Sequence, residues 1–338
     1  MHRTDLATHL PALLQTVAAA CRVTRHVQTE LEHIRQHTKD DRSPVTVADY
    51  AAQAIVAARL AELDAPLLLV GEEDAGTLRD AGSAALRDAV TAAVRTVWPE
   101  ATGDAVLDAI DTGDHDASAA RYWTLDPIDG TKGFLRNGQY AVSLALIEHG
   151  EVVFGALGCP NLATDFTRAF DDPDARGCLF YAVAGGGSWM VPADQPDARP
   201  LAIGVSRTNE LAAMRVCESV EAGHSRLDDT ARIVEYLGAG GRPARLDSQC
   251  KYAVVARGQA DAYLRLPTQR SYVEKIWDHA AGAIVATEAG AIVTDIHGHA
   301  LDFSCGTGLT ANRGVVCAAP GYHAALLDAI TALGVGSV

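Results

Sequence analysis

The stretch WTLDPIDGTKGF, residues 123–134, places two carboxylates three residues apart and follows them directly with glycine, threonine and lysine. Its first letters are typical of a strand, so Asp126 should lie at the carboxyl end, where Pro127 fixes φ and Gly130 permits a sharp turn. Three residues span at most about 10 Å, so in a turn the carboxylates of Asp126 and Asp129 lie closer than that. Two charges about 5 Å apart repel by roughly 3 kcal/mol at an effective dielectric constant of about 20. The stretch therefore predicts a positive charge between the two acids.

Three arrangements would relieve this repulsion: one carboxyl is protonated, a lysine or arginine bridges the pair, or a hard divalent cation binds both. Lys132 is a candidate bridge, but one lysine would not explain two further acidic groups. GEED (71–74) follows a strand-like run directly, and Asp278 follows Trp277 at the start of a predicted helix. Oxygen ligands in this number suit Mg²⁺ better than Zn²⁺, which favours histidine and cysteine.

Each acidic group also has an ordinary structural explanation. Asp-Pro-x-Asp-Gly is most often a turn, Glu-Glu-Asp after a strand is usually a solvated loop, and Asp278 alone is most often an N-cap. Thr131 is also a candidate N-cap, and if a helix begins there, the backbone N–H groups of residues 130–132 form an anion site. The joint occurrence of these groups favours a metal pair beside a phosphate cradle.

The composition indicates an ordinary globular protein. Its 338 residues, 48% of them hydrophobic, can bury a sizeable core and suggest two domains. A formal net charge of −15 argues against a nucleic-acid or membrane-surface protein, because a polyanion would be repelled over most of the surface. The seven cysteines form no Cys-x-x-Cys, which favours reduced thiols over a disulfide framework or a zinc knuckle. The N-terminus lacks a signal-peptide pattern and no run of about 18 apolar residues occurs, so we expect a cytoplasmic protein.

Hydrophobic periodicity changes character near the proline-rich segment 191–200. The earlier part predicts helices mixed with an antiparallel sheet: helices at about 5–35, 47–63 with Thr46 as N-cap, 84–98 and 103–110, a strand at 67–70, an acidic loop at 108–118, and hairpins at 140–158 and 178–191. The later part predicts strands at 201–205, 261–266, 291–295 and 314–318 that alternate with helices at 227–237, 249–257, 279–289 and 321–333. We therefore expect an α+β domain at 1–190 and an α/β domain at 200–338.

Several blocks of the sequence resemble one family. SPVTVADY (43–50), GEED (71–74), DPIDGTKGF (126–134) and WDHAAG (277–282) resemble the metal motifs of the inositol monophosphatase-like, lithium-sensitive magnesium phosphatases. ESVEAGHS (218–225), DSQCKYAVVARGQADAYLRLP (247–267) and YVEKIWDHAAG (272–282) resemble the 3'(2'),5'-bisphosphate nucleotidase branch of that superfamily. The blocks follow one another in the expected order, although residues 75–120 match no motif. The resemblance implies the sugar-phosphatase fold, in which α and β layers stack as αβαβα, and this agrees with the α+β and α/β patterns.

The resemblance also assigns two to three Mg²⁺ ions to this chain. The first would bind Glu72, Asp126 and the carbonyl of Ile128. The second would bind Asp126, Asp129 and Asp278. Most of these ligands come from the predicted first domain, and Asp278 comes from the second.

A third, weaker ion would lie by Glu72 with Asp49 nearby. By the same resemblance, Asp49 and Thr131 would orient and deprotonate the attacking water. Gly130 and Thr131 would bind the phosphate to be removed.

Four residues of the predicted second domain match positions that hold the nucleotide, chiefly its other phosphate and its base: His224, Ser248, Lys251 and Arg265. Three of them also have structural explanations, because an arginine in an alternating strand is commonly solvated, a histidine is often a turn residue, and Ser248 would N-cap a helix that begins near Gln249. Lys251 and Arg265 are nevertheless the local positive charges that an anionic ligand of this acidic chain requires.

The implied reaction is the Mg²⁺-dependent hydrolysis of 3'(2')-phosphoadenosine 5'-phosphate to AMP and phosphate, by in-line attack of water. The sulfated analogue of this small-molecule substrate would be a second substrate. No organic cofactor, nucleic acid or membrane partner is implied, and the oligomeric state is left open. Two alternatives remain: a phosphatase for inositol (poly)phosphates or sugar phosphates, and a non-catalytic nucleotide sensor. The sensor is disfavoured because the proposed ligands and the pair that activates water are all present.

Overall fold

The first sheet has seven strands, which pair in the order of the chain. β1 (Leu69–Gly71) runs parallel to β2 (Arg121–Asp129), and all later neighbours are antiparallel. These later strands are β3 (Ala141–Glu148), β4 (Glu151–Cys159), β5 (Cys178–Val183), β6 (Ser188–Pro192) and β7 (Leu201–Ile203). Because β3 pairs with β4 and β5 pairs with β6, the two predicted hairpins are confirmed. The computed structural model describes residues 3–35, 43–220, 227–267, 269 and 271–336.

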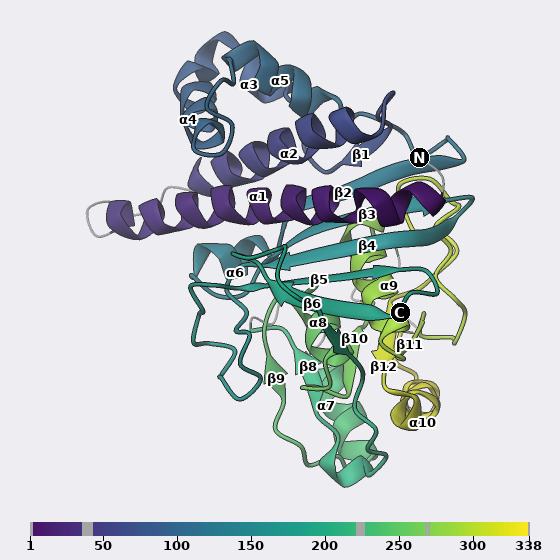
Figure 1. Ribbon diagram of the computed structural model, residues 1–338. Coiled ribbons are helices and arrows are strands. Elements are labelled where there is room, and N and C mark those ends of the chain that lie inside the picture. The colour runs from purple at the N-terminus through teal and green to yellow at the C-terminus, as the bar shows by residue number, and fades with distance from the viewer. Residues whose placement is uncertain (1–2, 36–42, 221–226, 268, 270, 337–338) are drawn as a thin grey trace.

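One face of this sheet is covered by long helices (Figure 1). α1 (Arg3–Arg35) and α2 (Ser43–Leu63) pack side by side on it, and the small helices above α2 are α3 (Gly76–Arg79), α4 (Ala84–Arg95) and α5 (Gly103–Asp111). Thr102 caps α5, because its hydroxyl accepts the backbone N–H of Ala105 at 3.2 Å. Alanine and valine side chains of α1 and α2 meet Leu125 and Leu144 of the sheet in one apolar cluster. The first two layers are thus an α layer on a β layer.

The opposite face of the sheet carries α8 (Cys250–Ala256) and α9 (Ala280–Glu288), which also pack on the second sheet. The first seven residues of α9 are all buried, as is expected of a helix that is covered on both sides. The second sheet has the order β11 (Ile292–Thr294), β12 (Val315–Ala318), β10 (Ala262–Arg265), β8 (Val216–Glu218) and β9 (Ala244–Arg245). Its outer face packs against α7 (Leu227–Tyr236) and α10 (Pro320–Ala332). The layers therefore stack as αβαβα, and the predicted fold class is confirmed.

The start of α2 differs from the sequence-based prediction. α2 begins at Ser43, so Thr46 is a helical residue and not the N-cap. Proline is tolerated in the first turn of a helix, where its missing N–H has no partner to lose, and Pro44 therefore does not delay the start.

The acidic segment 108–118 also differs from the prediction of a solvated loop. Its first residues continue α5, and Arg79 of α3 binds Asp111 at 2.6 Å and Asp108 at 3.1 Å. An arginine outside the segment thus neutralises part of its charge, and periodicity within the segment could not show that.

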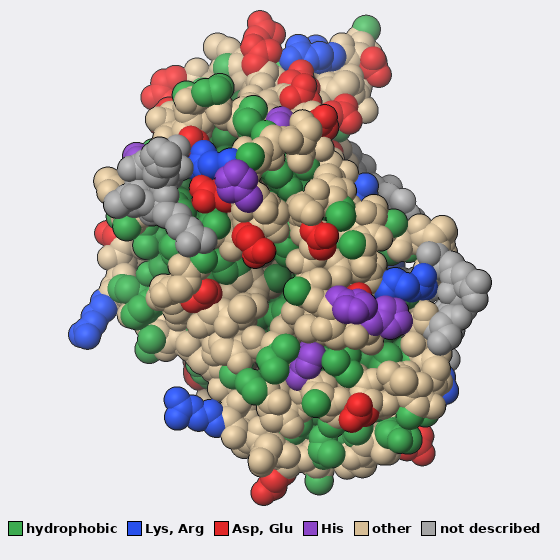
Figure 2. Space-filling model, turned by 90° about the vertical axis from the view of Figure 1, so that its right-hand side faces the viewer, with side chains coloured by type: hydrophobic (Ala, Val, Ile, Leu, Met, Phe, Trp, Pro, Cys, Tyr) green, Lys and Arg blue, Asp and Glu red, His purple; other side chains and the backbone are tan. Residues whose placement is uncertain are grey.

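The proline-rich segment 191–200 does not end the first sheet, because β7 lies after it and pairs with β6. The division into domains at 1–190 and 200–338 stays a prediction. No helix in the described ranges is long and apolar enough to cross a membrane. On the face shown in Figure 2, the basic side chains that are drawn lie apart from one another among acidic and neutral ones.

The contact between α9 and β4 offers a test of the layered packing. A Cβ on Gly155 would lie 2.4 Å from Cγ2 of Ile284 and 2.9 Å from the carbonyl oxygen of Ala281. We expect Gly155→Ala to lower the free energy of unfolding by about 1–3 kcal/mol in urea titrations, because overpacking forces the two layers apart. Gly82→Ala is the control, since nothing lies within 4 Å of its added Cβ. Equal stability of the two variants would contradict this close packing.

Candidate active site

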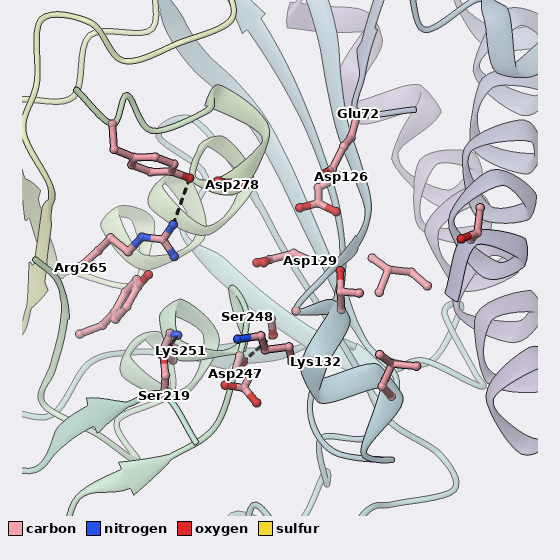
Figure 3. A pocket seen from close by; sticks show the side chains of 17 residues that line it. Glu72, Asp126, Asp129, Lys132, Ser219, Asp247, Ser248, Lys251, Arg265 and Asp278 are labelled. Atoms are coloured by element: carbon pink, nitrogen blue, oxygen red, sulfur yellow. Dashed lines mark hydrogen bonds between the residues drawn. The ribbon is translucent and has the colours of Figure 1, made fainter. Parts of the chain in front are cut away.

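A pocket of about 520 Å³ lies between the end of β2 and the second sheet (Figure 3). It is lined by Thr46, Glu72, Asp126, Ile128, Asp129, Gly130, Thr131, Lys132, Leu135, Ser219, Asp247, Ser248, Lys251, Tyr263, Arg265, Tyr272 and Asp278. The five predicted metal ligands are all among them, as are five of the predicted catalytic and substrate-binding residues. Figure 3 shows Glu72, Asp126 and Asp129 on one side of the pocket and Lys251 and Arg265 on the other.

An irregularity in β2 brings Asp126 and Asp129 to the same pocket. In the ladder with β3, Asp126 faces Ser143 and Asp129 faces Ala141, so three steps along β2 match two steps along β3. In a regular strand, residues an odd number of positions apart point to opposite faces. The extra residue is a β-bulge, which turns the end of the strand and re-aims its side chains.

Glu72 enters the pocket from the loop that follows β1, and Gln53 of α2 holds that loop. The Gln53 side-chain amide donates to the carbonyl oxygens of Glu73 at 2.5 Å and Ile110 at 3.0 Å, and its oxygen accepts the N–H of Glu73 at 3.1 Å. Gln53 is fully buried. No local sequence pattern indicates this role, because Gln53 and Glu73 are twenty positions apart.

Without a cation, the pKa values of four acidic side chains of the pocket are raised. These side chains, called the acidic group below, are Glu72, Asp126, Asp129 and Asp278. Burial, and then the charges of Glu72, Asp129 and Asp278, raise the pKa of Asp126 well above its usual range. Burial raises the pKa of Glu72 to about 7, and burial with the charge of Asp129 raises that of Asp278 to about 7. Burial also raises the pKa of Asp129. These shifts measure how strongly the group disfavours its own negative charge.

The group fits a hard divalent cation. Oδ1 of Asp126 is buried and has no hydrogen-bonding partner among the described residues. A buried polar atom without a partner is costly, and a cation would supply the missing interaction and reverse the unfavourable electrostatics. The donors are carboxylate oxygens, which Mg²⁺ and Ca²⁺ prefer.

Asp49 lies beside this group but does not line the pocket. It is in α2 and is 8% exposed. Burial, followed by the charges of Glu73 and Glu72, raises its pKa well above the usual range. Its carboxyl is therefore within electrostatic reach of Glu72.

The turn after β2 requires glycine at position 130. Gly130 has a φ of 91°, and a Cβ there would lie 2.8 Å from the Cβ of Ser248. α6 (Thr131–Leu135) begins at the next residue, so the helix start on which the predicted anion site depends is present. Figure 3 shows α6 beside Asp129 and Lys132.

Ser248 lies at the pocket, one residue before Gln249, which is the N-cap of α8 in place of the predicted Ser248. The hydroxyl of Ser248 accepts the backbone N–H of Cys250, the first residue of α8, at 3.2 Å. Its φ is 67°, which is uncommon for a residue with a side chain. The next residue, Gln249, donates its backbone N–H to Asp129 at 2.5 Å. The start of α8 is thus tied directly to the acidic group.

Lys251 and Arg265 give the pocket a positive side. Lys251 is 5% exposed, and its ammonium donates to the hydroxyl of Ser219 at 3.1 Å. Arg265 is also mostly buried, which rules out the alternative explanation that it is merely a solvated arginine of an alternating strand. Glu274 binds the guanidinium of Arg265 through two contacts of 3.1 Å. His224 lies outside the described residues.

Glu274 was missed by the sequence analysis, although it lies in the quoted block YVEKIWDHAAG. Glu274, Asp278 and His279 bring their potential ligand atoms within 4.8 Å of one another. Both carboxylate oxygens of Glu274 already accept hydrogen bonds from Arg265 or His279. Burial alone would raise its pKa, but His279 and Arg265 hold it at about 2. Glu274 is therefore better matched to Arg265 than to a metal ion.

The fold is that of the inositol monophosphatase-like proteins. The structure of inositol monophosphatase from Anabaena matches this chain with a TM-score of 0.61 and 20% sequence identity over 97% of each chain. A sequence model of the inositol monophosphatase family matches residues 5–333, and the chain belongs to that family. Members of this family depend on metal ions.

Relatives of higher identity carry a more specific name. The 3'(2'),5'-bisphosphate nucleotidase of Schizosaccharomyces pombe is 41% identical over 307 residues, which are 88% of this chain and 86% of the relative. The 3'(2'),5'-bisphosphate nucleotidase of Oryza sativa is 40% identical over 339 residues, which are 96% of this chain and 94% of the relative.

Proposed function

We propose that the protein is a Mg²⁺-dependent 3'(2'),5'-bisphosphate nucleotidase, which hydrolyses adenosine 3',5'-bisphosphate to AMP and phosphate. The observation that carries this proposal is one pocket with the carboxylates of Glu72, Asp126 and Asp129 on one side and Lys251 and Arg265 on the other. A substrate with two phosphates matches this arrangement, because one phosphate can react beside the acids while the other binds the cations. The names of the relatives agree with it. The sulfated analogue would also present one phosphate to the acids and another to the cations.

The proposed metal ligands are Glu72, Asp126, the carbonyl of Ile128, Asp129 and Asp278, which would hold two ions, with a third near Glu72. When bound, Mg²⁺ supplies charge stabilisation for the transferring phosphoryl group and lowers the pKa of water. The residues themselves fix the oxygen geometry: the bulge in β2 aims Asp126 and Asp129, and Gln53 holds the loop of Glu72.

The other residues position the substrate. The backbone N–H groups at Gly130 and Thr131 would bind the phosphate that leaves, because they begin α6. Asp49 and Thr131 would orient the attacking water and accept its proton. Ser248, Lys251 and Arg265 would hold the other phosphate and the base, together with His224. Phosphoryl transfer needs mainly this positioning and electrostatic stabilisation.

A panel of phosphate-release assays with Mg²⁺ tests the proposal. We expect kcat/KM for adenosine 3',5'-bisphosphate to exceed that for inositol 1-phosphate, inositol polyphosphates and sugar phosphates, since these do not place a nucleotide against Lys251 and Arg265. A higher kcat/KM for any inositol or sugar phosphate would show that the protein is a phosphatase for that compound and not a nucleotidase. Tight nucleotide binding with no release of phosphate from any substrate would indicate a sensor.

Lithium gives a second test of the metal assignment. The resemblance to lithium-sensitive phosphatases implies that Li⁺ competes for one Mg²⁺ position and stalls the product complex. We expect LiCl to inhibit phosphate release at concentrations where NaCl and KCl have no effect, and excess Mg²⁺ to relieve part of the inhibition. If the three salts act alike, this chain is not lithium-sensitive and that Mg²⁺ position is misassigned.

We also propose that the protein works in the cytoplasm. All seven cysteines are free thiols, and six of them are buried. Free thiols in this number are typical of a reducing compartment.

A further inference from the structure

The guanidinium of Arg265 is held along one edge. Its Nε donates to Oε1 of Glu274 at 3.1 Å, and its Nη2 lies 3.1 Å from Oε2 of the same carboxylate. This is the two-point contact in which a planar guanidinium and a planar carboxylate match. Nη1 is then the nitrogen that no described residue binds, and Figure 3 shows the guanidinium of Arg265 extending into the pocket.

Glu274 is itself fixed from two sides. Its backbone carbonyl accepts the N–H of Leu309 at 2.8 Å, and its Oε2 lies 3.3 Å from Nε2 of His279. Nδ1 of His279 lies 2.8 Å from the hydroxyl of Tyr252, a buried residue of α8. If that hydroxyl donates to Nδ1, then Nε2 carries the proton and donates to Glu274. A continuous hydrogen-bonded series thus runs from α8 through the start of α9 to Arg265.

The carboxylates of the pocket explain why Arg265 needs a fixed partner. Arg265 is close enough to Asp278 and Asp129 for their charges to interact. A long, flexible arginine without a fixed partner would turn toward these two carboxylates and occupy the positions proposed for cations. Glu274 accepts two hydrogen bonds of the guanidinium and is itself in contact with His279, so it competes with that movement.

We propose that Glu274 is a positioning residue, which fixes the orientation of the Arg265 guanidinium and presents its Nη1 to the phosphate that does not react. This inference rests on the proposed function, because it assumes that Arg265 faces the second phosphate of a nucleotide. Glu274 contacts neither substrate nor metal and acts only through Arg265.

The test is the affinity of the Mg²⁺-loaded protein for AMP, measured by calorimetry on wild type, Glu274→Gln, Arg265→Gln and the double variant. Removing a negative charge near a phosphate would by itself tighten binding, so the sign of the change is informative. We expect Glu274→Gln to weaken AMP binding by about 5- to 20-fold, because the guanidinium loses its charged partner and its fixed orientation. KM for the bisphosphate should rise with it, while kcat changes less.

The double variant shows whether Glu274 acts through Arg265. We expect Glu274→Gln to add no further loss in the Arg265→Gln background, since coupled residues are not additive. Glu148→Gln is the matched control: Glu148 also binds an arginine, Arg121, at 3.0 Å, but at the far end of β2 from the pocket. Glu148→Gln should leave the affinity for AMP unchanged.

The proposal would be overturned if Glu274→Gln bound AMP as tightly as wild type or more tightly. It would also be overturned if Glu274→Gln weakened AMP binding as much in the Arg265→Gln background as in wild type. If Glu274→Gln fails to fold, Glu274→Asp replaces it: it keeps the charge but shortens the side chain, and it should weaken AMP binding in wild type and not in the Arg265→Gln background. If wild type binds AMP but does not cleave the bisphosphate, the proposed function fails while the coupling still tests Glu274. If wild type does not bind AMP at all, both fail.

Discussion

Asp126→Asn should lower kcat for phosphate release by at least about 1,000-fold and leave the folded protein intact. Asp126 is the proposed ligand of two cations, and its Oδ1 is buried without a hydrogen-bonding partner among the described residues. Charge stabilisation by a bound metal ion is worth several kcal/mol, and each 1.4 kcal/mol, roughly, is a factor of ten in rate. Asparagine has the same shape but no charge, so it removes the interaction with metal and little else.

The stability of this variant should change in an unusual direction. Without metal, burial and neighbouring acids raise the pKa of Asp126, which means that its negative charge destabilises the folded state at neutral pH. We therefore expect metal-free Asp126→Asn to melt at the same temperature as the wild type or higher. Mg²⁺ should raise the Tm of Asp126→Asn much less than that of the wild type, because a ligand stabilises the folded state only to the extent that it binds to it.

A second buried aspartate is the control. Asp295 is 1% exposed, and its Oδ1 accepts the N–H groups of His297 and His299 at 2.9 Å, outside the pocket. Asp295→Asn should lower the stability and keep kcat, the reverse of the pattern for Asp126→Asn. A folded Asp126→Asn with wild-type kcat at saturating Mg²⁺ would refute the two-metal assignment.

Motifs that complete their geometry within a few residues were predictable from the sequence. The stretch at 123–134 contains the strand, the extra residue of the bulge, the left-handed glycine and the helix start, so its two acids and its turn followed from local rules. The long helices and the hairpins were equally readable, because their apolar periodicity extends over many residues. β8 and β9 were missed because three and two residues are too few to show a period.

Partners that meet only in the folded chain were not predictable. Gln53 holds the loop of Glu72 from a different element, and Ser219 accepts the hydrogen bond of Lys251 across 32 positions. Glu274 was quoted within a motif, yet its meaning depends on β10 and α9 placing Arg265 and His279 on either side of its carboxylate. The ligand types could be listed from the sequence, whereas the residues that aim them could not.

Lys251→Met should lower the preference for adenosine 3',5'-bisphosphate over p-nitrophenyl phosphate, as a ratio of kcat/KM values, by about 10- to 150-fold. A charge-assisted contact with phosphate contributes roughly 1.5–3 kcal/mol, and a small monoester does not extend to the cationic side of the pocket. Methionine matches the length of lysine and retains its apolar stem. The variant therefore tests the charge alone.

Stability separates this functional role from a structural one. Burial, followed by the charge of Arg265, lowers the pKa of Lys251, so the folded protein disfavours its ammonium. The ammonium donates to a neutral hydroxyl, that of Ser219, and lies 5.0 Å from the ring centre of Tyr263. An apolar side chain of similar volume should remove the free-energy cost of burying the ammonium, and we expect Lys251→Met to keep or raise the Tm.

Lys275→Met is the matched control, because Lys275 lies 5.3 Å from the ring centre of Trp277 but does not line the pocket. Lys275→Met should leave the substrate ratio unchanged. If Lys251→Met lowered the Tm and reduced both activities by one factor, Lys251 would be a structural lysine, and the second phosphate would have to bind elsewhere.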